Sequence, residues 1–247
     1  LKHLGKVAED TYICLGKVAT VMLNRKIDSE IEKHFASTKK AMFLTGARQV
    51  GKTYAIRKYA RQHDLRLVEM NFLLQPESIT VLKGAGDIKD LMLRISAYTK
   101  ESLVPGKTLI FFDEIQEYSD IMTWVKALVD EGSYFYALSG SLLGVEMKNI
   151  RSVPVGYLSE YQMFPLDFEE FVLSAGLPQN VLESLRKSWE SRSPVDEFVH
   201  QKMMQLFRLY LIVGGMPAAV QAYVNTNNIQ NVVKEQRDIL DLYKVDI

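Results

Sequence analysis

Residues 41–53 have the sequence Ala-Met-Phe-Leu-Thr-Gly-Ala-Arg-Gln-Val-Gly-Lys-Thr, and this stretch decides the fold. Its last eight residues, Gly46 to Thr53, match the pattern G-x-x-x-x-G-K-[ST]. A short apolar run, Ala41–Thr45, precedes the pattern, and a helical stretch, Lys52–Arg61, follows it. The glycines allow successive backbone N–H groups to surround a phosphate, and the N-terminus of the helix faces the same anion. The stretch therefore predicts a strand, a phosphate-binding loop and a helix.

The residues of this loop have distinct expected roles. Lys52 would reach the β- and γ-phosphates of a nucleoside triphosphate, and the Thr53 hydroxyl would take one position on Mg²⁺. Arg48 is also a candidate for neutralising transition-state charge within the same chain, although we rank it no higher than an ordinary member of the loop. The residues expected to bind the nucleotide are Gly46, Ala47, Arg48, Gln49, Val50, Gly51, Lys52, Thr53 and Tyr54.

A second motif, Leu-Ile-Phe-Phe-Asp-Glu at 109–114, lies downstream of the loop. Its apolar strand would deliver Asp113 to the carboxyl edge of an open α/β sheet, where ligands bind. We expect Asp113 to hold Mg²⁺ through the water shell of the ion. Glu114 is the candidate base that polarises a water for attack on the γ-phosphate. An apolar strand ending in Asp-Glu is often only a solvated strand end, but its position after a complete phosphate loop predicts an ATPase site.

The order of the strands follows from the same motifs. A carboxylate directly after the magnesium aspartate is typical of hydrolysing ATPases that place an extra strand between the two motif strands. We predict this strand at Tyr134–Leu138, ended by Ser-Gly-Ser at 139–141. The hydroxyl of Ser139 or Ser141 would then lie beside the γ-phosphate and sense its presence. A Ser-Gly-Ser turn that merely ends the strand explains these residues equally well.

The remaining chain completes an α/β prediction: a P-loop NTPase core with a parallel sheet flanked by helices, followed by a small all-helical lid. We divide the chain into an N-terminal extension and helix (1–40), the core (41–165) and the lid (166–247). The last predicted helix starts at Ile229 and has no Gly or Pro stop, so we expect a further C-terminal domain beyond it. Other expected elements are a strand within 65–72 and helices at 22–35, 88–98, 122–129, 168–173, 181–189, 195–211 and 218–223.

Composition argues against several classes of protein. The 30 Lys and Arg balance 30 Asp and Glu, so no bulk positive field attracts nucleic acid. The single cysteine, Cys14, cannot form an internal disulfide, and the four histidines lack metal-ligand spacing. Glu9 and Asp10 lie where a signal peptide needs apolar residues, and the uncharged run Leu209–Val233 is too polar to span a bilayer. We expect a cytoplasmic protein with no membrane partner.

These motifs resemble the AAA+-like ATPases predicted in archaea and bacteria, a group that usually carries a C-terminal domain of unknown function. From about Met22 to Ile247, five blocks occur in the order of that family: GARQVGKT, IFFDEIQ, LSGSLLG, SVPVGYLSEYQMFPLDFEEF and YLIVGGMP. The resemblance implies an ATPase core that binds ATP or ADP with Mg²⁺, a helical lid and a missing C-terminal region. Tyr157 departs from the family, because a basic residue is expected after Pro-Val-Gly.

Two further candidate residues follow from known ATPase motifs. Pro217 in Gly-Gly-Met-Pro resembles the Gly-x-Pro lid motif of signal-transducing ATPases, whose proline packs near the adenine-bearing end of the nucleotide. A helix–helix turn, with Gly for the turn and Pro to start the next helix, explains the motif equally well. Arg151 is a candidate arginine finger supplied to a neighbouring subunit of a homo-oligomer. A plain surface or structural arginine is the commoner explanation of such a residue.

We predict a Mg-ATP-binding, ATP-hydrolysing AAA+-like ATPase that acts as a nucleotide-driven switch or motor on a client protein. One alternative is a nucleotide-locked switch that binds protein or DNA with little turnover. Another is a P-loop kinase, against which the base position directly after Asp113 argues. The positive charge concentrated between Lys52 and Arg66 is the feature that favours DNA, but a solvated helix face is the commoner meaning of such a cluster.

Overall fold

The structure is a computed structural model that describes residue 23, residues 25–141 and residues 156–245. The chain divides into two compact units, Arg25–Asp167 and a unit that contains Phe168–Ile247. Across the described ranges, no helix combines the length and apolar character needed to cross a membrane.

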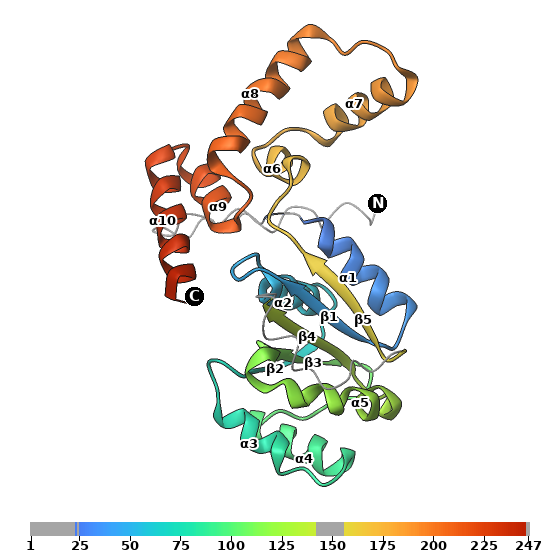
Figure 1. Cartoon of the computed structure of the whole chain (residues 1–247). Helices are drawn as coiled ribbons and strands as arrows, with labels where there is room; N and C mark the ends of the chain where they lie inside the picture. The colour runs from blue at the N-terminus through green and yellow to red at the C-terminus, as the bar shows by residue number, and fades with distance from the viewer. Residues whose placement is uncertain (1–22, 24, 142–155, 246–247) are drawn as a thin grey trace, which may run out of the picture. The chain divides into compact units, whose positions relative to one another are not determined.

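The first unit contains a five-stranded sheet in the order β2-β3-β4-β1-β5, in which every neighbouring pair is parallel (Figure 1). This arrangement confirms the predicted α/β class and the predicted extra strand, because β4 lies between the two motif strands β1 and β3. The strands are β1 (Ala41–Gly46), β2 (Arg66–Asn71), β3 (Thr108–Asp113), β4 (Phe135–Ser141) and β5 (Leu158–Met163).

Burial explains which strands were visible in the sequence. Every residue of β1 and β3 is buried, as expected for central strands that are covered on both faces. The edge strand β5, with the sequence Leu-Ser-Glu-Tyr-Gln-Met, is partly exposed along most of its length. Its polar residues break the apolar run that marks a buried strand, and the sequence analysis therefore missed it.

Helices cover both faces of this sheet (Figure 1). On one face, α1 and α2 meet through stacking of Phe35 on Tyr59, and Phe35 also packs edge-on against Phe135 of β4. On the other face, a core that includes Ile110, Leu82 and Leu128 joins the sheet to the remaining helices. The helices of this unit are α1 (Lys26–Ser37), α2 (Lys52–Gln62), α3 (Glu77–Lys83), α4 (Ile88–Thr99), the 3₁₀ segment η1 (Ile115–Thr123) and α5 (Val125–Glu131).

Two sequence-based assignments were wrong in detail. The Ser-Gly-Ser residues at 139–141 do not end β4 but belong to it, because β1 pairs with them as far as Gly46 opposite Ser141. In place of the helix expected at 122–129, the structure has the end of η1 followed by α5. The 3₁₀ segment η1 is itself kinked at Tyr118. Pairing with β1 holds the backbone of the small Ser-Gly-Ser residues in β4.

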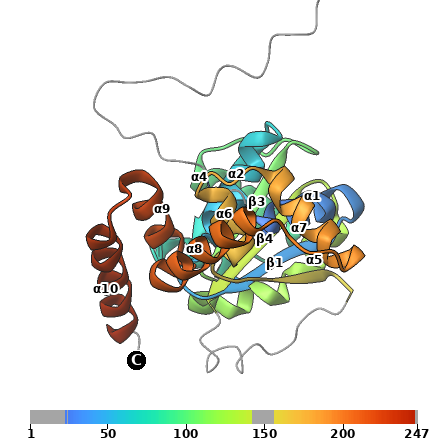
Figure 2. The same ribbon diagram turned by 90° about the horizontal axis from the view of Figure 1, so that it is seen from above.

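The second unit is helical, and its α9 and α10 lie side by side in both views (Figures 1 and 2). Gly214 ends α8 with a positive φ of 72°, and Pro217 occupies the first turn of α9, where its missing N–H costs nothing. Gln236 of α10 donates to the carbonyl oxygens of Ile212 and Val213, which satisfies the end of α8. The helices are α6 (Phe168–Ser174), α7 (Gln179–Ser191), α8 (Glu197–Val213), α9 (Pro217–Thr226) and α10 (Ile229–Val245).

The close approach of Gly46 to β5 gives a test of the fold. A Cβ atom at Gly46 would collide with the carbonyl oxygen of Met163, and the φ of +150° is one that residues with a side chain rarely adopt. We expect Gly46→Ala to lower the free energy of unfolding of the nucleotide-free protein by roughly 1 to 3 kcal/mol. Gly86→Ala is the control, because a Cβ there meets no atom within 4 Å. Equal unfolding midpoints for the two variants in denaturant titrations would contradict this account.

Candidate functional site

The candidate site begins where β1 ends, in the loop that leads to α2. Gln49 and Gly51 adopt positive φ angles of 63° and 99°, so the loop turns back on itself before the helix starts. Gly51 caps α2, and the first turn of α2 carries no acidic residue. The partial positive charge of the helix N-terminus is therefore not cancelled by a side chain of that turn, which suits the binding of an anion.

Lys52 is folded into this loop. Its Nζ donates to the carbonyl oxygens of Gly46 at 3.0 Å and Ala47 at 2.9 Å, and the side chain is buried. Burial lowers the pKa of Lys52 below its ordinary value, while the carboxylates of Glu114 and Asp113 oppose this shift. The cation is thus held at the mouth of the phosphate loop and close to both carboxylates of the second motif.

The Asp113 carboxylate accepts hydrogen bonds from residues of several elements. Asp113 is 2% exposed and lies at the end of β3. Oδ2 accepts from Thr53 Oγ1 at 2.8 Å and from Asn71 Nδ2 at 3.0 Å, whereas Oδ1 accepts from the Glu114 N–H at 3.1 Å and from Ser139 Oγ. Four donors on two oxygens fit an ionised carboxylate, which can only accept.

Glu114 has an unusual backbone conformation. Its φ of 57° and ψ of 51° place it in the left-handed region, which costs a residue with a side chain about 1 kcal/mol or more. Its half-buried carboxylate accepts a 2.6 Å hydrogen bond from Gln116 Nε2. Such backbone strain concentrates at functional sites, and here it turns the chain sharply between β3 and η1.

The Mg²⁺ predicted from the sequence can be tested against these oxygens. Thr53 and Asp113 are already in contact, and a hydroxyl with a carboxylate is a donor set that Mg²⁺ accepts. Within the described part of the chain, no group of three or more His, Cys, Asp or Glu side chains could hold a metal by itself. Mg²⁺ commonly uses few protein ligands and completes its shell with water and substrate phosphates.

Sequence reasoning missed three residues of this site. Asn71 ends β2 next to Asp113, and a signal for it existed, since polar residues at the carboxyl ends of neighbouring parallel strands meet at one edge. Gln116 lies inside the block IFFDEIQ, but no sequence rule assigns a role to a glutamine two residues after Glu114. Arg25 donates to the carbonyl oxygens of Val50 and Phe164, and nothing in the sequence marks this contact with the loop.

The other predicted residues have varied positions. Ser139 is fully buried and donates to Asp113, and the Ser141 N–H donates to Gln116 Oε1 at 3.3 Å. Tyr54 is exposed on α2 beneath the guanidinium of Arg61. Arg151 lies outside the described residues, as do Cys14 and the residues before Leu23.

Pro217 and Tyr157 are two further predicted features. Pro217 belongs to the helical unit, and its contact with a nucleotide stays a prediction. Tyr157, which replaces the expected basic residue, lies beside the ammonium of Lys126, 5.6 Å from the ring centroid, so a cation does face this position.

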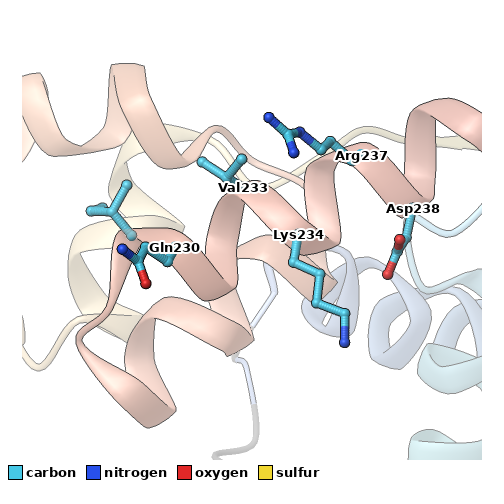
Figure 3. A pocket seen from close by; sticks show the side chains of 6 residues that line it. Gln230, Val233, Lys234, Arg237 and Asp238 are labelled. Carbon is cyan, nitrogen blue, oxygen red and sulfur yellow. The ribbon is translucent and has the colours of Figure 1, made fainter.

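A hollow of about 360 Å³ lies on α10 (Figure 3). All of its described lining comes from one helix, and it includes none of the residues predicted for the nucleotide site. The lining residues are Ile229, Gln230, Val233, Lys234, Arg237 and Asp238.

Two solved structures that match this chain resemble it only distantly. No curated protein sequence matches the chain. Among solved structures, one titled Structure of Drosophila ORC bound to DNA matches at 12% identity and a TM-score of 0.44, covering 81% of this chain and 62% of that chain. The Structure of C. elegans PCH-2 matches at 12% identity and a TM-score of 0.45, covering 90% and 70%. This chain therefore spans less than two thirds of the ORC chain, and neither score carries an argument about function.

A family model is more informative. The model described as AAA domain matches residues 38–172, which is more than half of the chain and includes both motifs and all five strands. The chain therefore belongs to the AAA domain family of AAA+-like P-loop ATPases.

Proposed function

We propose that this protein binds ATP with Mg²⁺ and hydrolyses it, and that the nucleotide cycle acts on a client protein. The supporting observation is the cluster at the carboxyl edge of the sheet, where the hydroxyl of Thr53, the carboxylate of Asp113 and the ammonium of Lys52 lie together. Family membership supports nucleotide binding, and the left-handed Glu114 beside this cluster supports hydrolysis.

The proposed roles follow from charge and position. Lys52 and the N-terminus of α2 bind the triphosphate, and Asp113 with Thr53 holds the metal. Bound Mg²⁺ supplies charge neutralisation for the phosphate oxygens. Glu114 accepts the proton of the attacking water.

The remaining assignments belong to the same proposal. Ser139 or Ser141 senses the γ-phosphate, Pro217 belongs to a lid over the nucleotide, and Arg151 acts on a neighbouring copy in a homo-oligomer. A locked switch with little turnover would differ in one respect: it would retain ADP tightly and release almost no phosphate. A kinase would release phosphate only to an acceptor, so phosphate release without any acceptor distinguishes the proposed ATPase from both.

Lys52→Ala tests nucleotide binding. Removing the ammonium takes away the cation at the mouth of the loop, so we expect ATP affinity to fall at least tenfold. Isothermal titration with ATP and Mg²⁺ measures this change. Lys89→Ala is the control, because Lys89 is an exposed lysine of α4 away from the cluster. Wild-type affinity in Lys52→Ala would argue against the whole site.

Asp113→Asn tests the metal. An amide in place of the carboxylate loses the negative charge and turns a donor toward existing donors such as Asn71 or Ser139. We expect the wild-type protein to bind ATP more tightly with Mg²⁺ than with EDTA, and the variant to lose this difference. Asp120→Asn, an exposed carboxylate in η1, should keep it. If the variant still binds ATP as much more tightly with Mg²⁺ as wild type does, the assignment of Asp113 as a metal ligand is wrong.

Glu114→Gln tests hydrolysis. The amide keeps the size of the side chain but cannot accept the proton of water, so we expect turnover to fall about 100-fold or more while ATP binding persists. Phosphate release under steady-state conditions measures turnover. Glu117→Gln alters an exposed neighbour and should leave turnover unchanged. Equal turnover in Glu114→Gln and wild type would remove Glu114 from the role of base.

A further inference from the structure

The tip of β4 extends past one of its neighbours. The pairing of β3 with β4 ends at Phe112 opposite Leu138, whereas the pairing of β1 with β4 continues to Gly46 opposite Ser141. The last residues of β4 therefore have a strand on the β1 side but none on the β3 side. Buried backbone N–H groups need partners, and the Ser141 residue is only 4% exposed.

Gln116 occupies the place that β3 leaves empty. Its Oε1 accepts from the Ser141 N–H at 3.3 Å, and its Nε2 donates to Glu114 Oε2 at 2.6 Å. Only one orientation of the amide fits both partners, because an ionised carboxylate accepts and a backbone N–H donates. One side chain thus links the backbone of β4 to the carboxylate of the candidate base.

The surroundings of Gln116 keep this link in place. The preceding residue, Ile115, is 1% exposed and anchors the start of η1. Across from it, a Cβ atom at Gly140 would lie 3.3 Å from Ile115 Cγ1 and 3.6 Å from Gln116 Oε1. A side chain at 140 would thus crowd Ile115, while it would make only an ordinary contact with the Gln116 amide.

We propose that Gln116 is a positioning residue, whose amide fixes the Glu114 carboxylate relative to the last residues of β4. This inference rests on the proposed hydrolysis of ATP and names the regulation of that site. A displacement of Ser141 when the γ-phosphate binds or leaves is transmitted by the amide to Glu114. Gln116 does not touch the nucleotide; it sets where the base points.

Kinetics provide the first arm of the test. Gln116→Leu keeps much of the side-chain volume but makes neither hydrogen bond. We expect kcat for phosphate release to fall roughly 10- to 100-fold, because a misplaced base costs rate, while KM for ATP changes less than threefold. Gln116→Asn retains an amide that is too short to span both partners. We expect this variant also to lose kcat while its KM for ATP changes less than threefold. Gln62→Leu, at an exposed position near the end of α2, is the control and should match wild type.

Amide hydrogen exchange of the nucleotide-free protein provides the second arm, which needs no turnover. Since the Ser141 N–H donates to Gln116, its exchange should become faster in Gln116→Leu and Gln116→Asn and stay unchanged in Gln62→Leu. Residues of β1 opposite the tip, such as Thr45, should keep their protection. General loosening of the sheet would instead affect both strands.

The outcomes separate the two proposals. Unchanged kcat in both Gln116 variants, or equal losses in kcat and affinity, would overturn the positioning role while Glu114→Gln still tests the base. Unchanged exchange at Ser141 would overturn the link itself. If the wild-type protein releases no phosphate, the proposed hydrolysis fails, and the link is then judged by exchange alone.

Discussion

The carboxylate of Asp113 accepts hydrogen bonds from four donors, and these donors come from separate parts of the fold. Thr53 belongs to α2, Asn71 ends β2, Ser139 belongs to β4, and the Glu114 N–H follows Asp113 in the chain. A buried ionised carboxylate is stable only when its oxygens are satisfied in this way. The elements that surround the site are therefore held in one arrangement by a single charged group, and that group is also the proposed holder of the metal.

Local geometry, rather than bulk charge, makes this edge of the sheet suitable for a phosphate. The net charge of the chain is zero, so no bulk positive field attracts anions to the molecule. Instead, Gly46 approaches the backbone of β5 too closely for any side chain, and Lys52 is buried against the loop carbonyls.

Spacing rules predicted the residues whose chemistry is local and failed for those whose role depends on distant neighbours. The loop from Gly46 to Thr53 and the Asp-Glu pair were recognisable because each motif lies within a few consecutive residues. Asn71 and Gln116 lie in the same cluster without any such pattern. The end of β4 was placed too early for a similar reason, since pairing with β1 overrides the turn preference of Ser-Gly-Ser.

From the sequence alone came the α/β class, the extra strand between the two motif strands and the residue types proposed to face a nucleotide. The class follows from the periodicity of apolar residues, the extra strand from the Asp-Glu pair, and the phosphate loop from torsions that glycine adopts readily. The tertiary structure was needed to show that Ser139 donates to Asp113 and that Gln116 connects Ser141 to Glu114. The physical reason is that parallel strands gather residues far apart in the chain at one edge, and hydrogen bonds across that edge leave no trace in local sequence.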